Sequence, residues 1–378
     1  MYVSKVSLTN FRNYATAEIE LSEKQNFIFG LNAQGKTNFL EAVYLLCLGR
    51  SFRQARNQEL VKRETTFFNL RASLFQEPGI ERLVIINYNK DEKKEISIDR
   101  KRLSKHSKIF GQFPVVVMAP DEFRITTGAP AERRRFINVL LSQLSLSYLN
   151  DLQEYNRTLK QRNKILQNFR DGLRANDDAL EAWTQQLANV GGRIIELRHE
   201  FIGAFCTTVG SIYHRFTQST EKIEMTIESS VKYTNNDNND NAEGMFLKAL
   251  SGNEKKERIL GATMVGPHRD DVIITIDGMD LRKYGSRGEH KSVLISIKIA
   301  EFKHLQERIN ETPVLLLDDC YSELDNFREQ SVFGALDGLG QIILTSPKEP
   351  VLSDSLQLGG VEQARFIVED GHIEPLRN

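Results

Sequence analysis

The sequence predicts an α/β fold with a second, helical lobe, and three observations lead to this prediction. GLNAQGKT at 30–37 follows an apolar run at 27–29 and precedes a helix-like segment at 38–48. A second apolar run, at 314–317, follows a proline and ends in two aspartates, which is typical of a buried parallel strand. The segment between these regions has the 3–4 spacing of apolar residues that predicts helices.

The first element is a strand, a loop and a helix with the spacing of a phosphate-binding loop. Gly30 and Gly35 allow the backbone to fold with its N–H groups pointing inward, and the helix N-terminus adds partial positive charge. Lys36 is predicted to reach the outer phosphates of ATP, and the Thr37 hydroxyl to hold Mg²⁺. The residues predicted to bind the nucleotide in this segment are Gly30, Leu31, Asn32, Ala33, Gln34, Gly35, Lys36, Thr37 and Asn38.

The two aspartates after the second apolar run predict the other half of a nucleotide site. A carboxylate at the C-terminal end of a parallel strand is where a P-loop protein holds its metal, so Asp318 is predicted to bind Mg²⁺ together with Thr37. Asp319 is predicted to polarise the attacking water, which makes Asp319 and Lys36 the candidate catalytic residues. Two acids after a strand are also an ordinary helix N-cap signal, and only the accompanying GLNAQGKT favours a metal site.

The middle of the chain predicts an antiparallel pair of helices joined by the polar turn 171–178, with the first helix roughly 30 Å long. The apolar seams are Leu152, Tyr155, Leu159, Leu166 and Phe169, interrupted by Arg162, and then Leu180, Trp183, Leu187, Val190, Ile194, Leu197 and Phe201. Alternation at 223–227 predicts a strand, and the Asn- and Asp-rich stretch 234–241 predicts a mobile loop. We therefore expect a discontinuous ATPase lobe at 1–130 and 262–378 and a helical lobe at 131–261.

The wide separation of the two half-sites resembles the split heads of ABC-type P-loop ATPases of DNA maintenance. Such heads carry a Ser-x-Gly loop that opens a helix, and SRGEHKS at 286–292 fits this pattern, with its helix continuing to Phe302. In that superfamily the loop of one subunit covers the γ-phosphate bound by another. The resemblance implies that Ser286 and Gly288 contact ATP in trans and that ATP drives formation of a homodimer.

Four segments, in order along the chain, resemble the RecF family: VSLTNFRNY at 6–14, APDEFRITTGAPAERRRFIN at 119–138, GPHRDD at 266–271 and LLLDDCYSELD at 315–325. The first of them adds Arg12 to the expected nucleotide-binding residues, and SELD at 322–325 resembles a loop that communicates between subunits. Ala33 and Thr126 depart from the family pattern. Asp121 and Glu122 are the candidates for sensing the γ-phosphate, and the expected role of His268 is structural.

This resemblance implies an ATP-dependent DNA-binding protein of recombinational repair and replication restart. ATP would bring two heads together around double-stranded DNA near single-strand gaps, slow hydrolysis would release it, and recombinase loading would involve RecR and RecO. A weak DNA-dependent ATPase activity and a link to the SOS response to DNA damage are expected. Two other classes stay open, namely the ATPase subunit of a transporter and a defence ATPase coupled to a nuclease.

Composition limits the possible partners. The 378 residues are 40% hydrophobic, enough for about two domains, and the formal net charge of −1 gives no global attraction to nucleic acid. A DNA surface must be local, and the candidate basic clusters are Arg50-Arg53-Arg56, Arg100-Lys101-Arg102-Lys105-Lys108 and Arg133-Arg134-Arg135, of which we expect the last to tie the helical arm to the ATPase lobe. The three cysteines have no metal-ligand spacing, and with no apolar run long enough to cross a bilayer we expect a cytoplasmic protein.

Overall fold

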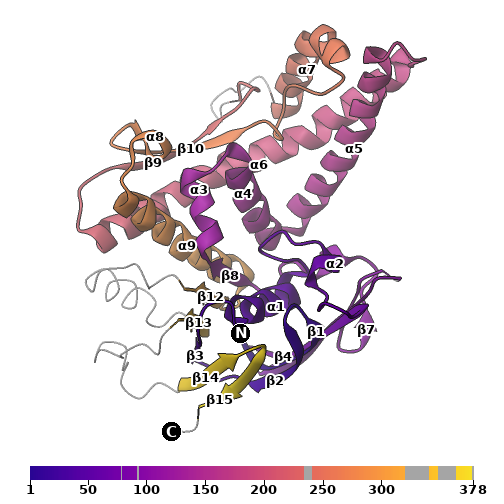
Figure 1. Ribbon diagram of the computed structural model, residues 1–378. Helices are drawn as coiled ribbons and strands as arrows, with labels where there is room; N and C mark the ends of the chain where they lie inside the picture. Colours follow the sequence, from indigo (N-terminus) through magenta and orange to yellow (C-terminus); the bar gives the residue numbers. More distant parts are fainter. Residues whose placement is uncertain (78, 92, 234–240, 320–339, 348–362, 377–378) are drawn as a thin grey trace. The chain divides into compact units, whose positions relative to one another are not determined.

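A computed structural model describes residues 1–378 except 78, 92, 234–240, 320–339, 348–362 and 377–378 (Figure 1). The expected mobile loop therefore lies outside the described residues apart from Asn241, as do Cys320 and the segment 322–325. The chain divides into two compact units, residues 1–123 with 294–378 and residues 124–293. Both boundaries differ from those expected, at 130/131 and 261/262. Residues 262–293 join the helical unit because they contain a strand that pairs with the strand at 223–228.

The first unit contains a largely parallel sheet built from both ends of the chain. Its strand order is β15-β14-β3-β13-β12-β8. The strands are β3 (Gln25–Phe29), β8 (Val115–Met118), β12 (Val314–Asp318), β13 (Ile342–Ser346), β14 (Gln363–Glu369) and the antiparallel β15 (His372–Pro375). All residues of β3, β8 and β12 are buried, as their largely apolar sequences predict for strands covered on both faces. The predicted parallel strand at 314–317 is thus confirmed.

An antiparallel sheet forms the rest of this unit, with the order β2-β1-β4-β5-β6-β7. Its strands are β1 (Tyr2–Phe11), β2 (Tyr14–Glu20), β4 (Phe67–Gln76), β5 (Ile80–Asn89), β6 (Glu95–Ile98) and β7 (Lys101–Arg102). Three short helices lie between strands of this unit or next to them: α2 (Asn57–Leu60) before β4, η1 (His106–Ile109) between β7 and β8, and η2 (Pro120–Phe123) after β8. Residues alternate between buried and exposed along β4, which is the pattern of a sheet with one face in the core.

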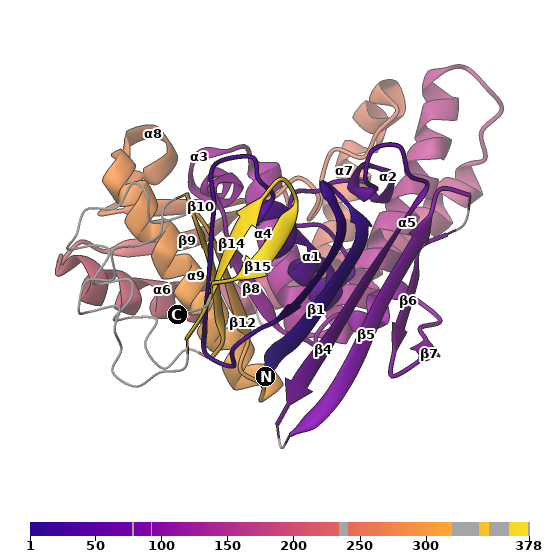
Figure 2. The same ribbon diagram turned by 60° about the horizontal axis from the view of Figure 1, so that its bottom comes forward.

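Helix α1 (Lys36–Leu48) packs between these two sheets (Figure 2). Every residue from Phe39 to Leu48 is buried, and the segment is apolar apart from Glu41. A helix that is apolar on all sides is stable only when it is surrounded by protein, so its position follows from its sequence. It begins at Lys36, within the GLNAQGKT segment, so the loop of residues 30–35 lies at the carboxyl edge of the parallel sheet, between the end of β3 and the start of α1.

The second unit is mainly helical. The predicted antiparallel pair is confirmed as α5 (Leu146–Arg170) and α6 (Asp177–Thr217), which contact each other along their lengths. A third helix, α7 (Ala242–Leu260), packs on both, so the arm is a three-helix structure and not only a pair. Arg162, which interrupts the apolar seam, is fully buried; it forms an ion pair with Glu257 of α7 at 2.8 Å and donates hydrogen bonds to Thr184 and Thr263. The remaining helices are α3 (Arg124–Thr127), α4 (Pro130–Leu144) and α8 (Leu281–Tyr284).

A small antiparallel sheet completes this unit, with β10 (Asp271–Ile276) between β9 (Ile223–Glu228) and β11 (Met279–Asp280). The predicted strand at 223–227 is confirmed as β9. Helix α9 (Arg287–Ile309) contains the boundary between the two units. It begins one residue after Ser286, as the SRGEHKS pattern predicts, and extends seven residues beyond the expected Phe302.

Candidate nucleotide-binding site

The GLNAQGKT loop needs glycine at two of its positions. Gly30 has φ +150°, and a Cβ there would lie 2.3 Å from the carbonyl oxygen of Val368 in β14. Gly35 has φ +124°, and a Cβ there would lie 2.6 Å from the Asn13 side-chain nitrogen. Gly35 is also the N-cap residue of α1, and among the described residues no side chain caps it. The first turn of α1 therefore presents N–H groups to a bound anion.

Lys36 is folded back onto its own loop. Its Nζ donates to the carbonyl oxygens of Gly30 at 2.6 Å and Leu31 at 2.9 Å. Burial lowers the pKa of Lys36, and the nearby carboxylates of Asp319 and Asp318 oppose this shift. An ammonium group in this place is ready to exchange carbonyl partners for phosphate oxygens, which are stronger acceptors.

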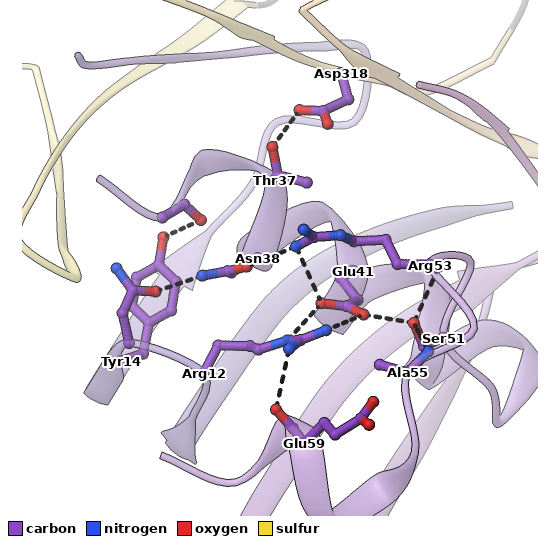
Figure 3. Close-up of polar contacts among 12 residues, drawn as sticks. Arg12, Tyr14, Thr37, Asn38, Glu41, Ser51, Arg53, Ala55, Glu59 and Asp318 are labelled. Carbon is purple, nitrogen blue, oxygen red and sulfur yellow. Dashed lines mark hydrogen bonds and ion pairs between the residues drawn. The ribbon is translucent and has the colours of Figure 1, made fainter. Parts of the chain in front are cut away.

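Asp318 lies between two threonines at the carboxyl edge of the parallel sheet. Its Oδ1 accepts from the Thr37 hydroxyl at 2.9 Å, a contact drawn in Figure 3, and from the Thr345 hydroxyl at 2.8 Å. Burial raises the pKa of Asp318, while the bonds from Thr345 and Thr37 lower it. Thr345, at the end of β13, was not among the site residues predicted from the sequence. The only signal for it is that β13 is parallel to β12, so that both strands end at the same edge.

The residues around Asp318 fit Mg²⁺ in one specific way. A carboxylate and a hydroxyl are oxygen ligands of the kind that Mg²⁺ prefers. Within the described residues there is no cluster of three or more His, Cys, Asp or Glu side chains that could hold a metal alone. Thr37 and Asp318 would therefore bind Mg²⁺ only together with the phosphates of a nucleotide and water, as is usual for this ion.

Asp319 follows in a left-handed backbone conformation, with φ +48°. Its N–H donates to the hydroxyl of Thr345 at 3.1 Å, so the ends of β12 and β13 are tied together at this point. The Asp319 carboxylate is near enough to Lys36 to raise that group's pKa against the effect of burial. Asp319 therefore lies beside the predicted phosphate site, and its role in polarising water stays a prediction.

Arg12 is held by Glu41 of α1 in a bidentate pair, at 2.8 and 2.9 Å, and its third nitrogen donates to the Glu59 carbonyl (Figure 3). The Glu41 side chain is fully buried. Arg53 donates to the Asn38 side chain at 3.3 Å, and its charge opposes the burial that raises the pKa of Asp318. The role of Arg12 as a nucleotide ligand stays a prediction. Arg53 is a second arginine beside the loop, and the sequence pattern placed it only in a basic cluster.

Ser286 and Gly288 lie in the other unit, at the start of α9. Ser286 forms a reciprocal cap with Glu289: its hydroxyl accepts from the Glu289 N–H at 3.2 Å, and its own N–H donates to the Glu289 carboxylate at 2.6 Å. Both hydrogen bonds are at the surface of the protein. The cap fixes the start of α9 and leaves the serine accessible. Contact between these residues and ATP in trans stays a prediction.

Three other residues named in the sequence analysis are Asp121, Glu122 and His268. Glu122 is buried and pairs with Lys298 of α9 at 2.7 Å, whereas its neighbour Asp121 is exposed. His268 Nε2 donates to the Thr263 carbonyl at 3.2 Å, and its Nδ1 forms a hydrogen bond of 2.7 Å with the Tyr155 hydroxyl. Both ring nitrogens of His268 are thus engaged within the helical unit, which agrees with a structural role.

Two arginines of the triplet, Arg133 and Arg134, contact the GPHRDD segment. Arg133 forms a bidentate pair with Asp271 at 2.7 and 2.9 Å, and Arg134 donates to the Asp270 carbonyl at 2.6 Å. Both partners lie in the same unit as the triplet, the mainly helical unit of residues 124–293. The described contacts therefore join α4 to the GPHRDD segment.

The chain matches the family model for the RecF/RecN/SMC N-terminal domain over residues 2–369. It is 36% identical to the DNA replication and repair protein RecF of Acetivibrio thermocellus, over 92% of this chain and 94% of that protein. It is 33% identical to the RecF of Salinibacter ruber, over 93% of this chain and 87% of that protein. No helix among the described residues is long and apolar enough to cross a membrane.

Solved structures agree with these relatives. A structure of the recombination mediator protein RecF-ATP in the RecFOR pathway matches with a TM-score of 0.90 and 31% identity, covering 100% of this chain and 98% of that one. An Smc head bound to a domain of ScpA matches at 14% identity and a TM-score of 0.55, which shows the fold alone. The split P-loop head, the NFRNY and GPHRDD segments and these similarities lead to one conclusion: the chain belongs to the RecF family and has the fold of an ABC-type ATPase head.

Proposed function

We propose that this chain is an ATP-dependent DNA-binding protein of recombinational repair and replication restart, in which ATP joins two heads around double-stranded DNA. One observation carries the nucleotide part of this proposal: the Asp318 carboxylate is held between Thr37 of the phosphate-binding loop and Thr345 of the neighbouring strand. A buried acid is costly unless it has a partner, and this arrangement supplies the oxygen ligands of a magnesium nucleotide.

In the proposed site Lys36 releases the carbonyls of Gly30 and Leu31 and binds the β- and γ-phosphates, while the N–H groups of the first turn of α1 bind the phosphate oxygens. Thr37 and Asp318 would hold a Mg²⁺ ion, which would supply positive charge beside the phosphates. Asp319 orients a water molecule toward the γ-phosphorus and accepts its proton. The end of β13 has no histidine that could hold the γ-phosphate. This sequence feature, together with an aspartate in the water-polarising role, supports slow ATP hydrolysis that acts as a timer.

The position of the Ser286 loop, SRGEHKS at 286–292, supports the proposed dimer. Ser286 lies at the surface, at the start of a 23-residue helix. This helix continues into the unit of residues 1–123 and 294–378, which we call the ATPase unit. A serine hydroxyl and a helix N-terminus at a surface are suited to a γ-phosphate held by a second copy of the chain. We infer that the two composite sites of a symmetric dimer each combine the phosphate-binding loop of one subunit with the Ser286 loop of the other.

A local basic surface supports the DNA part of the proposal. Lys94 donates to the Gly49 carbonyl at 2.6 Å, and its pKa is lowered by burial and by Arg50. The pKa of His106 is lowered by burial and by the charges of Lys94 and Arg102. The first two basic clusters of the sequence are therefore near one another, on the loop after α1 and on the β6–β7 turn. The exposed basic residues of these two clusters are Arg53, Arg56, Arg100, Lys101, Arg102, Lys105 and Lys108.

Partners are proposed from the family. The related solved protein is described as a recombination mediator in the RecFOR pathway. By this relationship we propose RecO and RecR as partners and gapped double-stranded DNA as the substrate. Since phosphate contacts position a protein without reading bases, sequence preference should be slight.

Mass-resolved sizing tests the dimer. We expect a monomer without nucleotide or with ADP, and a dimer with saturating ATP and magnesium, which duplex DNA stabilises. Lys36→Met should remain a monomer under all conditions because the phosphates lose their cationic partner, and Asp319→Asn should accumulate the dimer. A wild-type monomer under saturating ATP would exclude this function.

The DNA surface has a separate test. Replacing Lys101, Arg102 and Lys105 with alanine should reduce the slope of log affinity against log salt by about 0.9 for each DNA phosphate that the protein no longer neutralises. The matched control replaces Lys160, Lys255 and Lys256, three exposed lysines of the helical unit, so that the change in net charge is the same. Equal slopes in the two triple variants would remove the β6–β7 turn from the DNA surface.

A further inference from the structure

The phosphate-binding loop is held by hydrogen bonds from two turns that are distant in the sequence. The first turn, between β1 and β2, contributes Asn13 and Tyr14. Asn13 Nδ2 donates to the Gln34 carbonyl at 2.7 Å, and the Tyr14 hydroxyl donates to the Gly35 carbonyl at 3.0 Å. The side chain of Asn13 also accepts from Asn38 at 2.8 Å, so this turn contacts the loop and the start of α1 together.

The second turn, between β14 and β15, consists of Asp370 and Gly371. The Asp370 N–H donates to Gln34 Oε1 at 2.6 Å, and the Gly371 N–H donates to the Gln34 carbonyl at 3.1 Å. Both residues have positive φ, 44° and 75°, which turns their N–H groups toward the loop in a tight hairpin. Gln34 therefore accepts hydrogen bonds from both turns, which are separated by most of the chain.

The two turns also contact each other. A Cβ on Gly371 would lie 2.6 Å from the carbonyl oxygen of Asn13, and one on Gly30 would lie 2.3 Å from that of Val368. The loop is thus enclosed at its first residue by β14 and near its end by both turns. The residues between these points, 31–33, are exposed. The contacts fix the ends of the loop and leave its centre open to a ligand.

We infer that Gln34, Tyr14 and the β14–β15 hairpin act as positioning residues for ATP, and that the hairpin near the C-terminus is part of the nucleotide site without touching the nucleotide. The side-chain oxygen of Gln34 accepts from the Asp370 N–H, so this side chain links the loop to the hairpin. A loop held in its binding conformation loses less conformational freedom when it binds phosphate, so the hydrogen bonds to Gln34 and Gly35 favour nucleotide affinity. This inference rests on the proposed function only in taking ATP as the ligand.

The test compares three full-length variants. Gln34→Leu removes the acceptor for the Asp370 N–H, and Tyr14→Phe removes the donor to Gly35 while keeping the fully buried ring. Gln363→Leu is the matched control, because it removes a side-chain bond to Gln25 at the other end of β14, at 3.1 Å. With one hydrogen bond fewer, Gln34→Leu and Tyr14→Phe should each raise the Kd for a fluorescent ATP analogue about fivefold. Gln363→Leu should keep the wild-type Kd.

Hydrogen exchange without nucleotide gives an independent readout. The amides of residues 33–36 should exchange faster in Gln34→Leu and Tyr14→Phe, and at the wild-type rate in Gln363→Leu. Unchanged Kd and unchanged exchange in the two loop variants would overturn the inference, as would a Kd that rises equally in all three variants. A wild-type chain that fails to bind ATP would instead reject the proposed function, and the exchange comparison would still decide whether the turns hold the loop.

Discussion

Ala33 is the residue of the phosphate-binding loop at which the backbone conformation and the side chain disagree. Its φ of +67° is in the left-handed region, where a Cβ costs about 1 kcal/mol and glycine costs less. Ala33→Gly should therefore be neutral or should stabilise the protein by up to about 1 kcal/mol, despite the greater freedom of glycine in the unfolded chain. Thermal unfolding without nucleotide measures this. The control, Ala15→Gly at an exposed position of β2, should destabilise by about 0.5 to 1 kcal/mol. A loss at position 33 as large as at position 15 would mean that the left-handed conformation is not strained.

His268 makes stability depend on pH. Burial, together with nearby arginines, lowers the pKa of His268 to about 4, against about 6.5 in the unfolded chain. The folded state therefore takes up this proton less readily than the unfolded state, so the stability from His268 is complete above pH 6.5 and falls as the pH drops toward 4. The loss at pH 5 should be about 1 to 2 kcal/mol, allowing for partial exposure. His268→Gln keeps one donor and one acceptor, so its melting temperature should fall less between pH 7.5 and 5. An equal fall in both proteins would contradict the assignment.

Single residues show where sequence reasoning succeeds and where it stops. Gly30, Gly35, Lys36 and Thr37 could be predicted because their spacing within eight residues is itself the signal. Thr345 could not, because its place beside Asp318 depends on β13 lying between β3 and β12 in the sheet. The partners of Gln34 likewise depend on a strand order that no local pattern reports.

Helix α9 carries a buried charge cluster that fixes its position in the ATPase unit. Lys298 Nζ lies 2.7 Å from Glu122 and 2.8 Å from Glu301, and all three side chains are largely buried. The carboxylates raise the pKa of Lys298 against the effect of burial, and burial raises the pKa of Glu301. Glu122 lies just before the first boundary between the units, and Lys298 lies just after the second. The cluster therefore joins the two chain segments that connect the units.

Lys298→Met should lower the free energy of unfolding by about 3 kcal/mol, because two buried carboxylates lose their cation. Lys303→Met, on the same helix at a partly exposed position, should change it by less than about 0.5 kcal/mol. Denaturant unfolding of the full chain measures both. Adding Glu301→Gln to Lys298→Met should restore part of the loss. A single Lys298→Met variant as stable as Lys303→Met would show that the cluster makes no net contribution.

Elements were predicted from the sequence where periodicity is long and uninterrupted. The pair α5–α6 is an example, although α6 continues to Thr217, well beyond Phe201 at the end of the predicted seam. Helix α7 was not predicted separately, because its buried apolar residues, Ala242, Phe246 and Leu250, are few and much of the helix is polar. It is held by the Arg162–Glu257 pair, a contact between residues far apart in the sequence. Such a pair is visible only once the arm is folded.

At the scale of the whole molecule, the proposed dimer has two sites that each need both subunits. Lys36→Met removes the phosphate-binding half and Ser286→Arg removes the other half. Each variant alone should therefore be inactive as an ATPase. A mixture should regain activity, since a mixed dimer retains one complete site. Per mixed dimer the rate should be at most about half of the wild-type rate, because each mixed dimer has one complete site of two. No recovery, with mixed dimers shown to form, would indicate a site complete within one subunit.

The parallel sheet brings together strands from opposite ends of the chain, and this has a consequence for synthesis on the ribosome. β3, which leads into the phosphate-binding loop, has β13 and β14 as its neighbours. Neither is translated until roughly 15 to 60 s later, at ~5–20 residues per second. During that interval a strand that is fully buried in the folded protein, with its loop and helix, is present in the nascent chain without its sheet. We expect this segment to be the part of the newly synthesised protein that most depends on chaperones. We also expect the nucleotide site to be the last part of the structure to form.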